Sequence, residues 1–348
     1  MLENYAAVLH GPSDVRIEKW PMPLIGDDEL LIKISCVGIC GSDVKLYLTG
    51  RCGLEALLHP MVMGHEGAGV VAQVGSKVKG FVVGDRVAIE PTQPCGACLH
   101  CKHGAYNLCV EPRYCATATG HGNICTYYKH RADFCHKLPA NLSMEEGAAV
   151  QPLAIAVHAC KRARISLGTR LVILGAGPVG VLCMITARAM GATHILLTDV
   201  VESRLETAKK MGADHTLLIK PEYSEQDVVD KILTAVGDAP DVSIDACGYP
   251  SAQAVAMRAT QAGGTVVIVG IGPDRAEVPL AAAMLREVDV RGSYRIANTY
   301  PAALAAVSRG AVNLAPFITH HFPFERVKEA MEVAKSGAAM KIIIHMKS

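Results

Sequence analysis

The chain has 348 residues, with 50 % apolar and 19 % charged residues, a composition typical of a globular protein large enough for two domains. Its 34 Lys and Arg balance 33 Asp and Glu, so no basic stripe or acidic tail indicates nucleic acid or a charged membrane as the partner. Thirteen cysteines in a chain without a visible export signal indicate reduced thiols and metal ligation rather than a disulfide framework.

The N-terminus and the longest uncharged run decide the expected location. Residues Met1 to Tyr5 lack both the basic and the apolar region of an export signal. The uncharged run 171–187 is interrupted by three glycines and a proline, so a strand, a turn and a helix explain it better than a membrane span. We therefore expect a cytoplasmic protein without a membrane segment.

The first third of the chain has a β-strand pattern. Residues 5–90 contain short apolar segments separated by Gly, Pro and Asp, and the clearest strands are 29–37, 69–74 and 85–89. A cysteine-rich lobe follows at 94–114. This part of the chain is predicted to be a β-rich domain.

After about residue 153, apolar strands alternate with helices. The expected strands are 171–174, 194–198, 215–218, 242–245, 265–269 and 289–292, and the helices between them include 178–190 and 202–211. This alternation predicts an α/β domain with a doubly wound parallel sheet. Past residue 292 the pattern blurs, and 301–308 is predicted to be a helix that returns to the first domain.

Four cysteines of the lobe have the spacing of a metal site: Cys95, Cys98, Cys101 and Cys109. Four thiolates are the donor set of a tetrahedral structural zinc. The alternative is four free or disulfide-bonded thiols in a loop, which fits poorly with the rest of the chain, since that looks intracellular. Eight further cysteines are interpreted as small buried residues rather than ligands: Cys36, Cys52, Cys115, Cys125, Cys135, Cys160, Cys183 and Cys247.

A glycine-rich turn follows the predicted strand 171–174. In it, one glycine permits the tight turn, the next lets the backbone approach a pyrophosphate, and the last allows close packing of helix and strand. Asp199 lies nineteen residues after the last of these glycines, at the end of the next strand, where it would accept hydrogen bonds from an adenosine ribose. A carboxylate there favours NAD over NADP, although Arg204 leaves NADP open. The candidate cofactor-binding residues are Gly175, Gly177, Pro178, Val179, Gly180, Asp199 and Arg204.

A second glycine pattern carries a family resemblance. Gly64-His65-Glu66 is followed by Gly69, Gly75 and Val78, with Cys40 upstream. This run resembles the zinc fingerprint of the zinc-dependent medium-chain alcohol dehydrogenases. Within that family the chain is most similar to the sorbitol (polyol) dehydrogenase branch, and the similarity extends along the whole chain. The segments that carry this closer match are 115–117, 134–139, 286–289 and 298–301.

The resemblance implies a catalytic zinc held by Cys40, His65 and Glu66, with one tetrahedral position open. It also implies that zinc lowers the pKa of an alcohol whose hydride passes to nicotinamide. Ser42 matches the hydroxyl that relays the proton towards solvent, with a turn or helix-capping serine as the alternative. Together with Gln151 it is a candidate catalytic residue.

Four positions depart from the polyol pattern near the expected substrate pocket. Gln151 replaces a glutamate beside the zinc, which removes a negative charge. Lys45 replaces a histidine, and Leu46 and Ile296 each replace a tyrosine, which makes the pocket more apolar. The candidate substrate residues, including the three that match the family, are Leu46, Tyr114, Thr117, Arg295 and Ile296.

The sequence therefore predicts a GroES-like catalytic domain at 1–152 and 293–348 and a Rossmann domain at 153–292. We expect two zinc ions and NAD per chain, and a polyol such as sorbitol or xylitol interconverted with its ketose. Two alternatives stay open, a less polar secondary alcohol as substrate and a catalytically impaired member of the fold. Nucleic acid and membranes are not expected as partners, and the family implies a homodimer or homotetramer.

Overall fold

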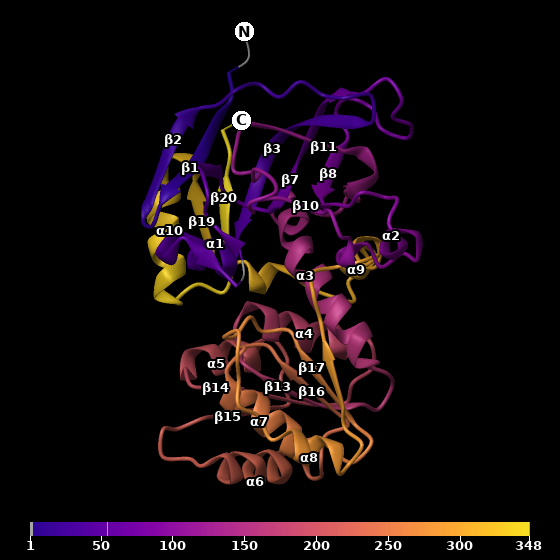
Figure 1. The fold of residues 1–348 in the computed structure, drawn as a ribbon, viewed down its shortest axis with the longest axis vertical. Helices are drawn as coiled ribbons and strands as arrows, with labels where there is room; N and C mark the ends of the chain where they lie inside the picture. The colour runs from indigo at the N-terminus through magenta and orange to yellow at the C-terminus, as the bar shows by residue number, and fades with distance from the viewer. Residues whose placement is uncertain (1–2, 54, 348) are drawn as a thin grey trace. The chain divides into compact units, whose positions relative to one another are not determined.

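A computed structural model describes residues 3–53 and 55–347 (Figure 1). By its internal contacts the chain forms two compact units, Met1–Gln151 with Tyr300–Ser348, and Pro152–Thr299. The sequence predicts domain boundaries after residues 152 and 292, whereas the boundaries of the compact units fall after residues 151 and 299. Helix α3 (Met144–Ala163) contains the change at 151 and was not among the predicted elements.

The first unit is built around a seven-stranded sheet. Six strands follow the order β12-β8-β7-β3-β20-β19, and β11 pairs with β3. Their bounds are β3 (Glu29–Ile39), β7 (Glu66–Val74), β8 (Arg86–Ile89), β11 (Tyr127–Arg131), β12 (Cys135–Lys137), β19 (His320–Pro323) and β20 (Ile342–His345). The central strand β3 supplies Leu30, Ile32 and Ile34 to the core, because alternate side chains of a strand share one face.

Shorter elements surround this sheet. A three-stranded sheet has the order β2-β1-β6. The strands are β1 (Tyr5–Gly11), β2 (Asp14–Lys19), β6 (Met61–Val62), and the pairs β4 (Arg51–Cys52) with β5 (Glu55–Ala56) and β9 (Thr92–Gln93) with β10 (Arg113–Tyr114). The helices are α1 (Gly41–Thr49), α2 (Leu99–Lys102), α9 (Tyr300–Ser308) and α10 (Val327–Ser336). Helix α9 confirms the predicted helix at 301–308.

The second unit contains six parallel strands in the order β15-β14-β13-β16-β17-β18. In chain order this is 3-2-1-4-5-6, the doubly wound arrangement that binds dinucleotides. The strands are β13 (Arg170–Leu174), β14 (His194–Asp199), β15 (His215–Leu218), β16 (Val242–Asp245), β17 (Thr265–Ile268) and β18 (Asp289–Gly292). The helices are α4 (Pro178–Ala189), α5 (Glu202–Lys210), α6 (Glu225–Val236), α7 (Pro250–Ala259) and α8 (Leu280–Met284). The predicted α/β sheet is confirmed, with strand ends shifted by one residue at most.

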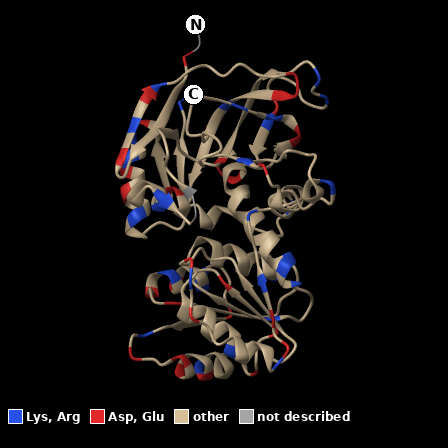
Figure 2. Cartoon of the chain, in the orientation of Figure 1, with Lys and Arg blue, Asp and Glu red and all other residues tan. Residues whose placement is uncertain are grey.

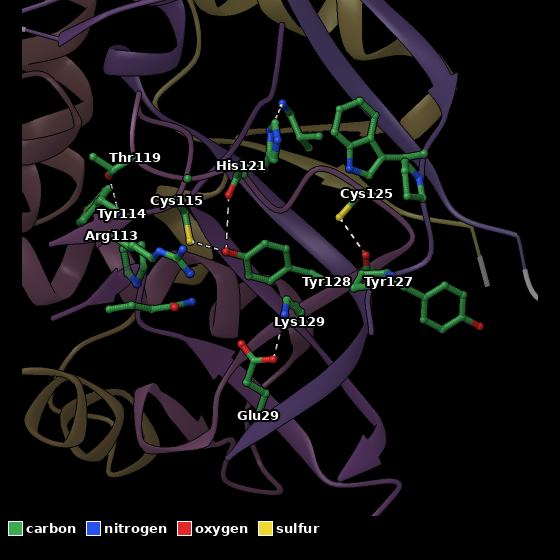
Figure 3. Close-up of a pocket in the computed structure, with 18 of the residues that line it drawn as sticks. Glu29, Arg113, Tyr114, Cys115, Thr119, His121, Cys125, Tyr127, Tyr128 and Lys129 are labelled. Atoms are coloured by element: carbon green, nitrogen blue, oxygen red, sulfur yellow. Dashed lines mark hydrogen bonds and ion pairs between the residues drawn. The ribbon is translucent and has the colours of Figure 1, made fainter. Parts of the chain in front are cut away.

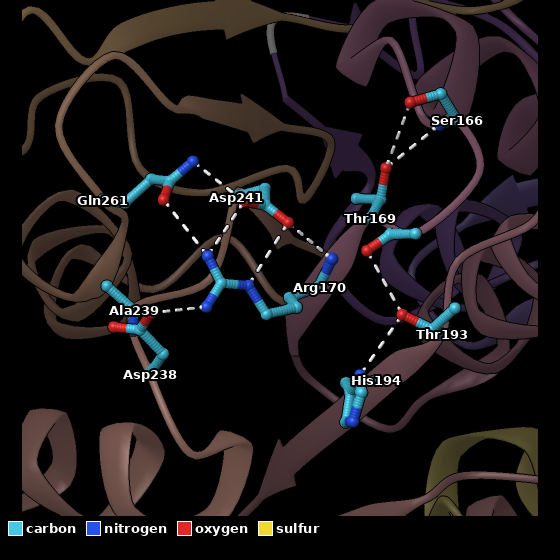
Figure 4. A network of polar contacts seen from close by, with 10 residues as sticks. Ser166, Thr169, Arg170, Thr193, His194, Asp238, Ala239, Asp241 and Gln261 are labelled. Atoms are coloured by element: carbon cyan, nitrogen blue, oxygen red, sulfur yellow. Dashed lines mark hydrogen bonds and ion pairs between the residues drawn. The ribbon is translucent and has the colours of Figure 1, made fainter.

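A polar network holds the amino ends of two neighbouring strands together (Figure 4). The Arg170 guanidinium lies 2.7 Å from Asp238 and 3.2 Å from Asp241, and Asp241 also accepts the Arg170 backbone N–H at 2.7 Å. Gln261 donates to Asp241 at 2.8 Å. This network lies at the amino ends of β13 and β16, so the carboxyl ends of these strands remain available for a ligand.

Segments coloured for Lys and Arg and segments coloured for Asp and Glu both occur in each of the two units (Figure 2). Among the described residues, no helix has the length and apolar character needed to cross a bilayer.

Candidate metal and cofactor sites

The three side chains predicted to bind a catalytic metal lie together in the first unit. Cys40 is the N-cap of α1, His65 precedes β7, and Glu66 is the first residue of β7. One sulfur, nitrogen or oxygen atom of each lies within 4.8 Å of the others. Gly38 lies opposite Glu66 in the β3–β7 pair, and a Cβ there would lie 2.1 Å from the Glu66 carboxylate. The absence of a side chain at residue 38 therefore leaves room for this carboxylate.

Asp43 orients the cluster from the first turn of α1. Its Oδ2 accepts the backbone N–H of Cys40 at 2.9 Å, and its Oδ1 lies 3.4 Å from Nδ1 of His65. Burial opposes protonation of His65, but the charge and hydrogen bond of Asp43 outweigh it and hold the pKa of His65 well above its usual value in the metal-free chain. A carboxylate on the far nitrogen of a ligating histidine fixes the ring and its tautomer.

Lys341 was not predicted as part of this site. Its Nζ lies 2.7 Å and 2.9 Å from the two carboxylate oxygens of Glu66, and it donates to the carbonyl of Ile39 at 2.9 Å. Lys341 is 3 % exposed and Glu66 is fully buried. A thiol, an imidazole and a carboxylate are donors that suit a catalytic zinc, so the residues fit the predicted ion, with Lys341 offsetting part of the carboxylate charge.

The other candidates of the first unit lie on α1, on α3 and in the segment 114–117. Gln151 is buried in α3 and donates to the Tyr114 hydroxyl, whose ring centroid lies 6.1 Å from that of His65. Thr117 donates to the Tyr114 carbonyl, and Leu46 is buried in α1. Ser42 lies in the first turn of α1 behind the N-cap Cys40, so it is not the capping residue.

Arg295 and Ile296 belong to the second compact unit. Ile296 is fully buried, whereas Arg295 is half-buried and has a φ of 52°. Their contribution to a substrate pocket remains a prediction. So does the effect of Lys45, which is exposed on α1.

The cysteine lobe brings its four thiols together. One sulfur of each lies within 4.8 Å of the others, with Cys98 Sγ 3.4 Å and Cys95 Sγ 4.0 Å from Cys101 Sγ. A Zn–S bond of about 2.3 Å places tetrahedral sulfurs about 3.8 Å apart, so these spacings suit zinc. Backbone N–H groups of Cys101 and Val110 lower the pKa of Cys98 to about 6, which favours the thiolate a metal requires.

A buried carboxylate ties the lobe to the sheet. Glu90 follows β8 and accepts a hydrogen bond of 2.6 Å from the Tyr106 hydroxyl of the lobe, and His136 lies 2.9 Å from its other oxygen. The ring of His136 stacks on Tyr300 with centroids 4.8 Å apart. No local sequence pattern indicates Glu90, because its partners Tyr106 and His136 are 16 and 46 residues away along the chain.

The cysteines interpreted as buried residues divide into two groups. Cys36, Cys115, Cys125, Cys135, Cys160 and Cys183 are buried, as expected. Cys52 and Cys247 are only half-buried, so that expectation was wrong for them. All thirteen cysteines are free thiols in the structure.

The glycine turn of the second unit has the shape that a dinucleotide requires. Gly175 has a φ of 107°, and a Cβ on Gly180 would lie 1.9 Å from the Gly175 carbonyl oxygen. Gly177 is the N-cap of α4, and a Cβ there would meet no atom within 4 Å. Pro178 and Val179 open the helix and are half-buried. The helix N-terminus therefore has open space beside it for a phosphate.

Asp199 ends β14 and binds this turn directly. Its Oδ2 accepts the backbone N–H of Ala176 at 2.8 Å, and its Oδ1 accepts that of Val201 at 2.9 Å. Arg204 lies 3.9 Å from Oδ2. The acid thus lies at the turn, as a ribose-binding residue would, and carries a structural role that was not predicted.

The first unit also contains a cavity of about 410 Å³ beside Tyr114 (Figure 3). Cys115 and the Tyr128 hydroxyl face each other in it at 3.1 Å, and His121 and Arg113 contribute to its wall. None of its described lining residues is Cys40, His65 or Glu66. The three candidate ligands therefore do not line it, whereas Tyr114, the neighbour of His65, does.

Comparison with known proteins agrees with this arrangement. Residues 26–140 match the alcohol dehydrogenase GroES-like domain, and residues 178–309 match the zinc-binding dehydrogenase domain. A sorbitol dehydrogenase of Bombyx mori is 64 % identical over 348 residues, covering 100 % of both chains. The chain belongs to the zinc-dependent medium-chain alcohol dehydrogenase family.

Other members of this family are similar over nearly the whole chain. A sorbitol dehydrogenase of Mus musculus is 44 % identical over 98 % of this chain and 96 % of its own. The solved structure of L-idonate 5-dehydrogenase from Escherichia coli superposes with a TM-score of 0.88 at 29 % identity, covering 99 % of this chain and 98 % of that one. The predicted resemblance and the GroES-like and Rossmann folds are confirmed.

Proposed function

We propose that this zinc-dependent dehydrogenase uses NAD to interconvert a polyol of the sorbitol or xylitol class and the corresponding ketose. The observation that carries the proposal is the convergence of the half-buried Cys40 with the buried His65 and Glu66, whose ligand atoms lie within 4.8 Å of one another. The polyol is supported by the names of the relatives with 64 % and 44 % identity.

Each protein group has a task in this chemistry. Cys40, His65 and Glu66 would hold the ion, and zinc bound by them supplies a Lewis acid that makes an alcohol easier to deprotonate. Asp43 keeps the His65 ring in position, and Lys341 keeps the Glu66 carboxylate in position. Ser42, in the first turn of α1, would pass the released proton towards solvent.

The cofactor follows from the turn at residues 175–180. Gly175, Gly177 and Gly180 shape the turn, and the α4 N-terminus would bind the pyrophosphate together with Pro178 and Val179. Asp199 would accept hydrogen bonds from the adenosine ribose and repel a 2′-phosphate, which favours NAD. The 3.9 Å separation of Arg204 and Asp199 supports the same preference, since the acid already engages the arginine.

One alternative substrate is favoured by a specific feature. Leu46 is 6 % exposed in α1 and offers no hydroxyl, and the resemblance places a tyrosine there. A pocket with fewer polar groups discriminates less against a less polar secondary alcohol. Gln151 in place of a glutamate supports the further alternative of an impaired enzyme.

Steady-state reduction of NAD across sorbitol, xylitol, other polyols and simple secondary alcohols tests the proposal. The polyols are expected to have the highest kcat/KM, with NAD preferred over NADP. Turnover of only the less polar alcohols would select the alternative substrate. No turnover of any alcohol by protein with measured, full zinc occupancy would favour the impaired enzyme.

We also propose that the chain forms a homo-oligomer in the cytoplasm. The homodimer or homotetramer is implied by the family, and the free state of all thirteen thiols is in keeping with a reducing compartment such as the cytoplasm. Sedimentation velocity at several protein concentrations measures the assembly, and a single monomeric species would contradict it.

A further inference from the structure

A third cluster of metal-binding donors lies on the first unit, apart from the two predicted sites. Cys36 of β3 and His345 of β20 are paired residues of adjacent antiparallel strands, and β20 lies between β3 and β19 (Figure 1). Glu145, in the first turn of α3, approaches them. The sulfur, a ring nitrogen and a carboxylate oxygen all lie within 4.8 Å of one another.

The separations are close to those of a tetrahedral site. Cys36 Sγ lies 3.6 Å from His345 Nδ1, and bonds of about 2.3 Å to sulfur and 2.0–2.1 Å to nitrogen require about 3.6 Å between these donors. Glu145 Oε1 lies 3.8 Å from the same nitrogen, against about 3.3 Å for tetrahedral N and O donors. A shift of the partly exposed Glu145 side chain is enough to close this difference.

The far nitrogen of His345 is also engaged as a ligating histidine requires. Nδ1 of His321 lies 2.9 Å from Nε2 of His345, with the ring centroids 5.1 Å apart. When Nε2–H donates to His321, Nδ1 of His345 carries a lone pair directed at Cys36 and Glu145. This is the partner arrangement that fixes the tautomer of metal-binding histidines.

The protonation states of two donors suit a cation. Burial lowers the pKa of His345, which favours the neutral ring. Burial opposes ionisation of Glu145, but hydrogen bonds with its own backbone N–H and with Ser143 outweigh it and lower its pKa, so the carboxylate is charged. Burial, together with Glu145, raises the pKa of Cys36 to about 12, and a metal would have to displace this proton.

We propose that Cys36, His345 and Glu145 bind a thiophilic divalent cation of the zinc class, with a fourth position open to solvent. Cys36 is 3 % exposed, whereas the side chains of His345 and Glu145 are 36 % and 31 % exposed. The cation thus has a buried sulfur at its base and a path to solvent on the other side. Cys36 then acts as a ligand as well as the small buried residue that the sequence suggests.

Equilibrium dialysis against graded free zinc, with bound metal measured by mass spectrometry, tests the site on the intact enzyme. The wild type is expected to bind one equivalent more than Cys36→Ser and His345→Gln. Cobalt added to wild type that holds zinc at the two predicted sites only is expected to give a thiolate charge-transfer band. Cys160→Ser, a buried cysteine of α3 outside every cluster, is the matched control and is expected to keep both signals.

Variants of two neighbouring histidines distinguish binding at this site from nonspecific binding of zinc to the surface. His321→Ala is expected to weaken the additional equivalent about 10-fold to 100-fold. The ring of His320 is directed to Thr319, so His320→Ala is expected to leave the additional equivalent unchanged. The proposal is overturned if the wild type binds no more zinc than Cys36→Ser, or if the cobalt band survives in both Cys36→Ser and His345→Gln. Circular dichroism of each variant verifies its fold, and His345→Gln alone decides if Cys36→Ser does not fold.

Discussion

The side-chain amide of Gln151 lies 3.3 Å from the phenol oxygen of Tyr114, both residues are buried, and the Tyr114 ring lies beside that of His65. The resemblance places a glutamate at residue 151, so this contact replaces one that would carry a negative charge. The amide satisfies the phenol but leaves the metal cluster more positive than a carboxylate would.

Gln151→Glu is therefore expected to raise kcat and to move the lower limb of its pH profile to higher pH by about one unit. An added negative charge close to the cluster stabilises the protonated form of the group that must ionise. The measurement is kcat for polyol oxidation as a function of pH. Gln226→Glu, on the exposed face of α6, is the control; identical profiles for wild type and Gln151→Glu would refute the role of residue 151.

Lys341→Met is expected to destabilise the metal-depleted protein by about 3–5 kcal/mol, since it leaves the buried Glu66 carboxylate without its cation. The loss is expected to be smaller in the zinc-loaded protein, because a bound ion offsets the same charge. Urea unfolding with and without zinc measures both values. Lys335→Met, half-exposed on α10, is expected to change stability by less than about 0.5 kcal/mol. Equal losses in the two states would argue against Glu66 as a ligand.

Asp199→Asn is expected to raise the KM for NAD about tenfold or more, because hydrogen bonds from the ribose to a charged acceptor contribute about 1.5–3 kcal/mol. The KM for NADP is expected to change less, since the repulsion of the 2′-phosphate is removed. The ratio of kcat/KM for the two cofactors measures this preference. Asp230→Asn on α6 serves as the control, and an unchanged ratio would exclude Asp199 from ribose recognition.

His130 is expected to make folding sensitive to mild acid. It is fully buried, its Nε2 lies 2.8 Å from the Glu90 carbonyl, and burial lowers its pKa to about 4. The unfolded chain takes up a proton near pH 6.5, so between about pH 6.5 and 4 the unfolded state binds more protons. Stability therefore falls as the pH is lowered through this window, by about 3 kcal/mol at its end.

His130→Gln is expected to remove that part of the pH dependence, measured as the free energy of unfolding at several pH values. His194→Gln is the control, because His194 is exposed at the start of β14. If the two variants lose stability with equal slopes between pH 6.5 and 4, then His130 is not the group responsible.

The sequence was sufficient to predict the parts of the molecule whose signals are local. The Rossmann unit follows from apolar strands that alternate with helices, and its glycine turn is read from six consecutive residues. The cluster of Cys40, His65 and Glu66 depends on a family fingerprint, because a single histidine or glutamate has no distinctive pattern. Its assembly also requires β3 and β7 to pair in one register, which places Gly38 opposite Glu66.

What the sequence could not predict are the contacts between distant segments. Lys341 is 275 residues from Glu66 and precedes an apolar strand. Nothing in the neighbouring sequence indicates a partner for a lysine at that position. Cys36 and His345 are brought together only by the pairing of β3 with β20. Helix α3 was not predicted, because the change from the β-rich to the α/β pattern near residue 152 falls inside this single continuous helix.

The close packing of the lobe thiols has a consequence for handling the enzyme. With Cys98 and Cys101 sulfurs 3.4 Å apart and Cys98 ionised near neutral pH, loss of the ion leaves a reactive nucleophile beside its resolving partner. Air oxidation during storage would then form a disulfide between Cys98 and Cys101. Zinc alone would not restore such a preparation, and a reductant would have to be added before the metal.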